Sequence, residues 1–127
     1  MFKWFLAIVL VGIGSNYCWA DYPMVDNILD GIALSESSDQ PLLIIFGAKW
    51  CPHCVNLKAD INNGVFTKEL DGKIVCYVDV DQHKDMKKQY RVTTLPDSRF
   101  LKDKKEVSIF SGYNKTKYKE WLKNVNK

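Results

Sequence analysis

The chain has 127 residues, a formal net charge of +3 and 46% hydrophobic residues. That length accommodates one domain with a single core and excludes a second domain. Basic and acidic residues are interleaved, as over residues 102–106, which is typical of a solvated turn and not of a nucleic-acid patch. We therefore expect no nucleic acid among its partners.

Residues 1–20 have the pattern of an export signal. An uncharged apolar run of ten residues follows Lys3, and Ala20 is a small residue suited to cleavage. The run is shorter than the ~20 apolar residues that a membrane span needs. We expect cleavage after Ala20, export to the bacterial periplasm and a mature domain over residues 21–127. The alternatives are an uncleaved N-terminal anchor, which alone would place the protein at a membrane, and lipid attachment through Cys18.

The first elements of the mature chain are predicted to be a helix, a linker and a strand. Apolar residues over 24–34 recur at helical spacing, which predicts an amphipathic helix with Met24, Ile28, Leu29, Ile32 and Leu34 on its apolar positions. Residues 35–40 are polar and precede Pro41, which favours a linker. The continuous apolar run over 42–46 suits a strand buried on both faces.

Further helices and a second strand are predicted in the middle of the chain. Pro52 suits the first turn of a helix, which should end at residues 62–64. A short helical turn is expected over 65–70 and a second apolar strand over 74–78. Residues 82–90 should be helical, with Met86 and Tyr90 facing inward.

The last third of the chain predicts a loop, a hairpin and a helix. The loop covers residues 91–97, and residues 98–102 and 106–110 form the hairpin. Asn114 can cap a final helix that runs to Val125 with one apolar face. Helices that alternate with strands, followed by a hairpin, predict an α/β fold with a mixed central sheet and helices on both faces.

Cys51 and Cys54 carry the clearest chemical signal. A cysteine at the start of a helix lies beside unsatisfied N–H groups and the positive end of the helix dipole, which stabilise a thiolate. A second cysteine one turn later is close enough to form a disulfide with the first. We expect Cys51, the more exposed thiol with the lowered pKa, to be the nucleophile and Cys54 to resolve the mixed disulfide.

The two residues between the cysteines should tune this pair. Pro52 stiffens the turn, and His53 can place a cation or a hydrogen-bond donor near the Cys51 thiolate. Both effects stabilise the reduced form, so the disulfide becomes a stronger oxidant. The sequence therefore predicts an oxidising pair, without a metal or an organic cofactor.

Two structural roles compete with this interpretation. A zinc site needs four ligands, and only Cys76 and His83 are further candidates. A disulfide that spans two residues contributes little loop-closure entropy as a structural link. Cys76 falls in a predicted buried strand, where a cysteine usually acts as a small hydrophobe. A regulatory role for that thiol would require it to be exposed.

The segment Phe46–Cys54, placed between a strand and a helix, resembles the thioredoxin superfamily. Thr93–Pro96 and Phe110–Tyr113 carry two further signatures of that superfamily. The resemblance implies a thioredoxin-like fold in which Pro96 is a cis-proline that faces the cysteines. It also implies that the backbone of Leu95 binds an extended substrate segment and that Trp50 shields the disulfide and shapes the contact surface, with ordinary packing as the alternative for Trp50.

Three features depart from that superfamily. Ile45 stands where thioredoxins carry a buried aspartate, so the second thiol lacks their internal proton acceptor. The Pro52-His53 pair resembles disulfide oxidases of the DsbA type, although the chain is too short for their inserted helical domain. Asp97 and Arg99 are unusually polar for the start of a strand, and they either pair with each other or mark a substrate surface.

The sequence thus predicts a small, exported, monomeric thiol–disulfide oxidoreductase. Its partners would be protein thiols or disulfides and a protein that recycles the redox pair. One alternative is a periplasmic reductase supplied by a membrane electron donor. Another, of a different class, is a non-catalytic peptide-binding module or chaperone on the same fold.

Overall fold

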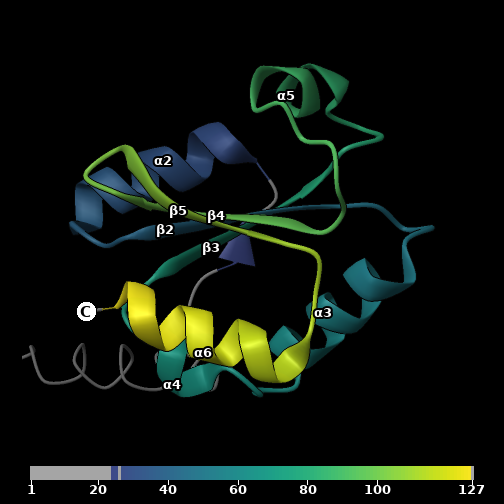
Figure 1. Ribbon diagram of the computed structural model, residues 1–127. Helices are drawn as coiled ribbons and strands as arrows, with labels where there is room; N and C mark the ends of the chain where they lie inside the picture. Colours follow the sequence, from purple (N-terminus) through teal and green to yellow (C-terminus); the bar gives the residue numbers. More distant parts are fainter. Residues whose placement is uncertain (1–23, 26, 127) are drawn as a thin grey trace, which may run out of the picture.

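Strand β2, Leu42–Gly47, runs through the middle of the sheet, and all six of its residues are buried. The computed structural model describes residues 24, 25 and 27–126, and its strand order is β1-β3-β2-β4-β5 (Figure 1). The apolar run predicted as a doubly buried strand is therefore confirmed, because elements cover both of its faces.

The sheet is mixed. Strands β1 (Met24–Val25) and β3 (Ile74–Asp79) run parallel along one side of the sheet, and β3 pairs in parallel with β2. Strands β4 (Asp97–Lys102) and β5 (Lys105–Ser111) form the predicted hairpin, and β4 pairs with β2 in the antiparallel direction. The parallel strands bring their C-terminal ends to the same edge of the sheet as the start of β4.

Helices form a layer on each face of the sheet (Figure 1). One layer contains α2 (Ile28–Ser38) and α5 (Lys84–Gln89). The other contains α3 (Pro52–Asn62), α4 (Thr67–Leu70) and α6 (Lys115–Val125).

Each layer closes its own hydrophobic core. The α2–α5 core consists of Ile28, Leu42, Ile44, Phe46, Ala48, Cys51, Cys54, Ile74, Cys76, Val78, Val80, Val92 and Leu101. The α3–α6 core consists of Leu43, Ile45, Leu57, Ile61, Phe66, Leu70, Val75, Phe100, Tyr118 and Leu122. Met86 and Tyr90 pack against the α2–α5 core, which confirms their predicted inward direction.

The prediction for residues 24–34 was wrong at its start. Met24 belongs to β1 and pairs with Val75, and the helix begins only at Ile28. The reason is local, because the Asn27 side chain accepts the backbone N–H of Leu29 at 2.8 Å and so caps the helix there. Leu29 is also 66% exposed, so it does not lie on the apolar face.

The predicted linker at 35–40 was also wrong over residues 35–38. Helix α2 continues through Ser38 and ends where Asp39 adopts the left-handed conformation at φ 55°. The hydroxyl of Ser38 donates to the carbonyl of Leu34 at 2.6 Å, and that of Ser35 donates to the carbonyl of Gln40. The polar segment is thus helical, with the Ser38 hydroxyl bonded within the helix and the Ser35 hydroxyl bonded to a carbonyl just beyond its end.

The C-terminal helix confirms its predicted cap. The side chain of Asn114 accepts the N–H of Lys117 at 3.0 Å, and α6 runs to Val125. Tyr118 on this helix is fully buried, and its hydroxyl lies 2.7 Å from the Ser98 hydroxyl of β4. That contact fixes α6 against the strand that follows Pro96.

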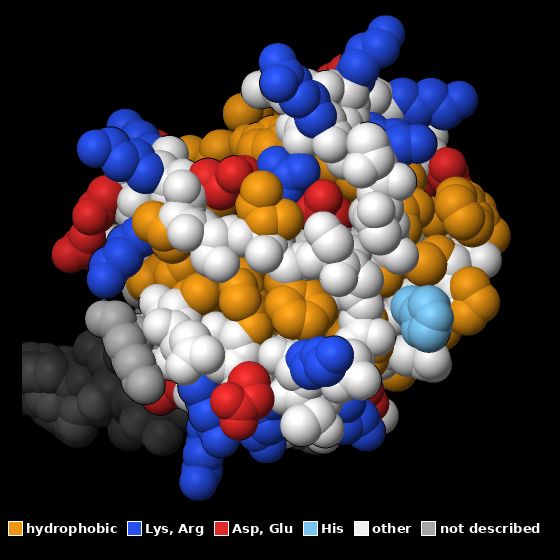
Figure 2. Space-filling model, in the orientation of Figure 1, with side chains coloured by type: hydrophobic (Ala, Val, Ile, Leu, Met, Phe, Trp, Pro, Cys, Tyr) orange, Lys and Arg blue, Asp and Glu red, His pale blue; other side chains and the backbone are white. Residues whose placement is uncertain are grey.

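The predicted signal segment, residues 1–20, lies outside the described residues. Within the described part of the chain, no helix combines the length and the apolar character that crossing a membrane requires. Lys and Arg side chains gather over α5, at the top of the view in Figure 2.

Candidate active site

Cys51 lies at the junction between β2 and α3. Pro52 occupies the first turn of α3, where its missing N–H leaves no helical bond unmade, and Cys51 is the N-cap residue. The Cys51 N–H donates to the Ala48 carbonyl at 3.2 Å, and its carbonyl accepts the Val55 N–H at 3.0 Å. The predicted strand-to-helix position of the motif is therefore confirmed.

Cys51 and Cys54 form a disulfide, with their Cα atoms 5.2 Å apart. Cys51 is 6% exposed and Cys54 is fully buried, so only Cys51 offers a sulfur to a partner. The Cys54 N–H donates to Cys51 Sγ at 3.3 Å. This N–H and the N-terminus of α3 are placed to stabilise a thiolate on Cys51 once the disulfide is reduced.

The two residues between the cysteines differ in what surrounds them. Pro52 fixes the start of α3, as the sequence predicts. His53 is exposed in the first turn of the helix, so its ring stands in solvent beside the disulfide.

Trp50 is held at the surface next to Cys51. Its side chain is 67% exposed, so ordinary core packing does not explain it. The indole Nε1–H donates to Oδ2 of Asp81 at 2.8 Å. Asp81 is not among the site residues predicted from the sequence. The sequence did contain a signal for this contact. Asp81 follows the end of β3, Trp50 follows the end of β2, and the two parallel strands end at the same edge of the sheet.

The loop before β4 contains the other predicted binding residues. The Leu95–Pro96 peptide bond is cis, the isomer that the resemblance implies. Pro96 is buried, and its carbonyl accepts the Gly112 N–H at 2.8 Å. Leu95 packs against the α2–α5 core, which includes both cysteines, and it precedes the first paired residue of β4.

Asp97 and Arg99 pair with each other. Arg99 Nε donates to Asp97 Oδ1 at 2.7 Å, and Nη2 donates to Oδ2 at 3.1 Å, with both side chains less than a tenth exposed. Arg99 also donates to Glu106 Oε1 at 3.0 Å and to the Tyr90 carbonyl at 2.7 Å. The hydrogen bond to Asp97 is the main reason that the pKa of Arg99 is raised. The network joins β4, β5 and the end of α5, directly after Pro96.

Ile45 and Cys76 have the surroundings that the sequence predicts. Ile45 is fully buried in the α3–α6 core, so no carboxylate lies at that position. Cys76 is also fully buried, and it lies outside the disulfide. Its burial removes the exposure that a regulatory thiol would require. Among the described residues, no group of three or more His, Cys, Asp or Glu side chains is arranged to hold a metal ion.

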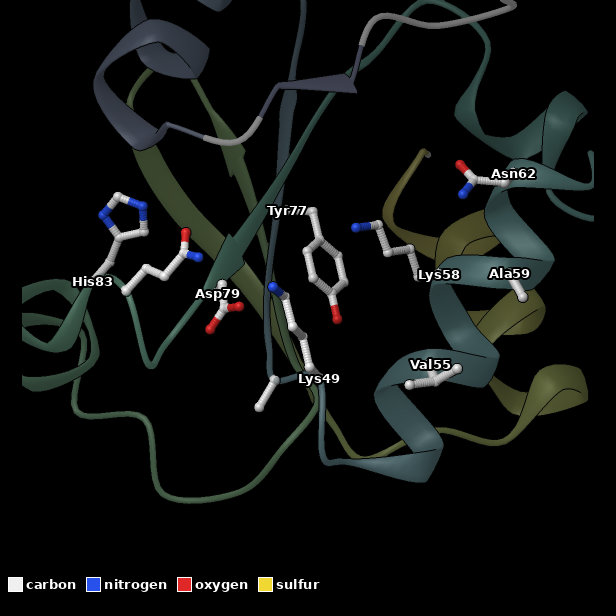
Figure 3. Close-up of a pocket in the computed structure, with 10 residues that line it drawn as sticks. Lys49, Val55, Lys58, Ala59, Asn62, Tyr77, Asp79 and His83 are labelled. Atoms are coloured by element: carbon white, nitrogen blue, oxygen red, sulfur yellow. The ribbon is translucent and has the colours of Figure 1, made fainter.

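A groove of about 510 Å³ opens between α3 and the end of β3 (Figure 3). Its charged and titratable side chains are those of Lys49, Lys58, Tyr77, Asp79 and His83. Apart from His83, considered above as a candidate zinc ligand, none of these residues has a function predicted from the sequence. They come from the loop before α3, from α3, from β3 and from the segment before α5, and only the fold brings them together.

The family profile described as thioredoxin matches residues 32–124. The chain belongs to the thioredoxin family. The match includes β2, the disulfide at the start of α3, the cis-proline loop and most of α6, so the site just described lies wholly within the family domain.

Known proteins and structures of this family are similar to the chain. Thioredoxin from Gallus gallus is 28% identical over 102 residues, which cover 80% of this chain and 95% of the relative. Protein disulfide isomerase-like 2-2 from Oryza sativa is 35% identical over 73 residues, 57% of this chain and 19% of the relative. The X-ray structure of Fasciola hepatica thioredoxin aligns with a TM-score of 0.68 at 31% identity, covering 80% of this chain and 97% of the other.

The relatives differ in how much of their length this chain matches. It spans between 19% and 22% of the disulfide-isomerase relatives, whereas it spans most of the thioredoxins. Together with the Cys51–Cys54 disulfide, the family supports a thiol–disulfide oxidoreductase of the thioredoxin and disulfide-isomerase kind.

Proposed function

We propose that this protein is an exported thiol–disulfide oxidoreductase that transfers its Cys51–Cys54 disulfide to protein substrates. The observation that carries the proposal is a disulfide at the N-terminus of α3 in which Cys51 is slightly exposed, at 6%, and Cys54 is fully buried. That asymmetry separates an attacking sulfur from a resolving one, which is the requirement for ordered exchange.

The transfer is balanced without any cofactor. A substrate thiolate attacks Cys51 Sγ, the Cys51–Cys54 bond breaks, and its electron pair goes to Cys54, which takes up a proton. A second substrate thiolate then attacks the substrate sulfur of the mixed disulfide, and Cys51 leaves as a thiolate. The substrate loses two electrons and gains a disulfide, while the protein becomes a dithiol.

An oxidising direction follows from stabilisation of the reduced form. The Cys54 N–H already points at Cys51 Sγ at 3.3 Å, and the positive end of α3 adds to that field. Pro52 restrains the turn, and a protonated His53 would add a cation beside the thiolate. This arrangement resembles disulfide oxidases of the DsbA type. A more stable thiolate is a better leaving group, which makes the disulfide a stronger oxidant.

Three residues form the substrate side of this site. Leu95 precedes the paired residues of β4, so its backbone is available to an extended substrate segment in a strand-like manner. Pro96 forms the wall behind that segment. Trp50, held by Asp81, presents its exposed ring to the same partner.

The role implies a second partner. The dithiol left after one transfer must be reoxidised by a recycling protein before it can act again. The protein acts as a monomer outside the cytoplasm, in the periplasm of a bacterium.

A stoichiometric transfer assay tests the proposal. The oxidised protein, mixed with reduced unfolded ribonuclease, should pass its disulfide on within minutes, and one equivalent of Cys51–Cys54 dithiol should appear for each ribonuclease disulfide formed.

Alkylation of cysteines in freshly lysed cells is a second test, and it should find the Cys51–Cys54 pair mostly oxidised. A pair that is mostly reduced in cells and transfers no disulfide would favour the alternative, a reductase supplied by a membrane electron donor.

A further inference from the structure

The proposed function does not explain how the negative charge on the resolving cysteine, Cys54, is stabilised. Cys54 is fully buried, yet it carries a negative charge each time the Cys51–Cys54 bond opens or closes. Burial of an uncompensated thiolate is costly and raises the pKa of the thiol. Ile45 offers no polar atom, so another group has to stabilise this charge.

Two polar residues pair with Ile45 in the sheet, Tyr77 of β3 and Ser98 of β4. The Ser98 hydroxyl is already paired with that of Tyr118, which leaves Tyr77 as the candidate. Tyr77 and Ile45 are direct partners in the parallel register of β2 and β3, so their side chains lie on the same face. Tyr77 packs against the α3–α6 core and is half-buried. A hydroxyl from the neighbouring strand thus lies on the sheet face where the carboxylate is missing.

Gly47 brings this hydroxyl close to Cys54. A Cβ atom placed on Gly47 would lie 2.2 Å from Tyr77 Oη and 3.2 Å from Cys54 Cβ. The tyrosine hydroxyl and the resolving cysteine therefore border the same small space, which exists because residue 47 has no side chain. Any other residue there would displace the tyrosine ring.

Lys58 of α3 contacts the ring of Tyr77. Its Nζ lies 4.6 Å from the centre of the Tyr77 ring, within the range of a cation–π contact. Figure 3 shows Lys58 reaching the ring from α3, while the hydroxyl of Tyr77 points toward the N-terminal end of that helix, near Val55. The contact of the ammonium group with the ring restrains the position of the ring.

We infer that the Tyr77 hydroxyl donates a hydrogen bond to the Cys54 thiolate, and that Gly47 and Lys58 position it for this role. The inference rests on the proposed function, since it concerns the charge that exchange creates on Cys54. It assigns to a tyrosine of β3 the stabilisation that Ile45 cannot provide.

The electrostatics of the groove indicate that the Tyr77 hydroxyl acts as a hydrogen-bond donor and not as a base. Burial raises the pKa of Tyr77 above its usual value, and Asp79 adds to the increase, so the hydroxyl keeps its proton at neutral pH. The charged or titratable groups that line the same groove are Lys58 from α3, Lys49 from the preceding loop, Asp79 from β3 and His83 from the segment before α5.

The charge on Cys54 arises in both directions of exchange. When the mixed disulfide is resolved, the Cys54 thiol loses its proton to solvent, and its sulfur attacks Cys51 Sγ. The bond between Cys51 and the substrate breaks, and the substrate leaves as a thiolate that takes up a proton. In the opposite direction, Cys54 is the leaving thiolate. Tyr77 stabilises the same charge in both directions.

An NMR titration of Cys54 tests the inference. In a Cys51→Ser background with ¹³C-labelled cysteine, the Cβ resonance of Cys54 reports its own pKa separately from that of Cys76. Tyr77→Phe should raise the pKa of Cys54 by about one unit, a tenfold gain in proton affinity, because a hydrogen bond to a charged group is lost. Tyr90→Phe, which removes the hydroxyl of another half-buried tyrosine, should leave the pKa unchanged.

A folded Tyr77→Phe protein with an unchanged Cys54 pKa would overturn the inference. If that variant does not fold, Lys58→Met decides the question in the same titration: a smaller rise supports the inference and no rise overturns it. The transfer assay on the unsubstituted protein tests the proposed function separately. A protein that transfers no disulfide but shows a Tyr77-dependent pKa would refute the function alone.

Discussion

Replacement of Cys51 by serine is expected to abolish disulfide exchange. The remaining active-site sulfur, Cys54, is fully buried and cannot reach a substrate. Loss of the nucleophile should lower the rate of insulin reduction, with dithiothreitol as the electron source, by about 100-fold or more, to the rate of dithiothreitol alone. The same variant should form no mixed disulfide with a substrate peptide, as measured by mass spectrometry.

Cys76→Ala is the matched control. Cys76 is buried and lies outside the disulfide, so its replacement should leave the exchange rate within about twofold of the original once the loss of stability is taken into account. The non-catalytic alternative, a peptide-binding module or chaperone, makes the opposite prediction. It requires Cys51→Ser to retain the protein's function in full.

Replacement of Arg99 by methionine is expected to cost about 3–5 kcal/mol in the free energy of unfolding. Methionine keeps much of the apolar stem, but the four hydrogen bonds to Asp97, Glu106 and Tyr90 are lost. Asp97 is then left buried without its partner, and that uncompensated charge accounts for most of the effect. Urea unfolding at neutral pH measures the change.

The exposed ion pair between Lys104 and Glu36 is the natural comparison. Its N–O distance is 2.8 Å, similar to that in the buried pair, but both side chains are largely in solvent. Lys104→Met should therefore leave the free energy of unfolding almost unchanged. A double variant, Asp97→Leu with Arg99→Met, should cost less than the two single variants added together. Additive costs, or a loss below about 1 kcal/mol for Arg99→Met, would show that the network contributes little.

Much of the fold could be predicted because its elements are strongly patterned. The apolar run of β2, the proline in the first turn of α3 and the Asn114 cap of α6 each determine a local structure by themselves. The errors arose where the pattern was weak. Strand β1 has only two residues, too few for a period, and it is defined by its pairing with β3.

The polar end of α2 shows a second limit of predicting the fold from the sequence. Serines favour turns and linkers because their hydroxyls compete for backbone groups. In α2 the hydroxyl of Ser38 uses that same capacity within the helix, on the carbonyl of Leu34. The sequence shows where the serines are, but it does not show whether their hydroxyls bond within a helix or within a turn.

Part of the candidate site was also beyond prediction from the sequence. The pairing of Cys51 with Cys54 could be predicted from their spacing, because a helix fixes their separation. The contact of Tyr77 with the space beside Cys54 depends on the register of β3 against β2 and on Gly47. Similarly, Asp97 and Arg99 share one face of a strand, but only the packing of α5 and β5 shows that this face is covered.

The reduction potential of the Cys51–Cys54 pair tests the central claim most directly. The purified domain is equilibrated with defined ratios of reduced and oxidised glutathione, and the fraction of disulfide is measured after acid quenching. We predict a reversible two-electron titration with a potential less negative than about −200 mV, in the range of known disulfide donors. A potential near about −270 mV, the value of thioredoxin, would contradict the oxidising role, and the absence of reversible titration would contradict exchange altogether.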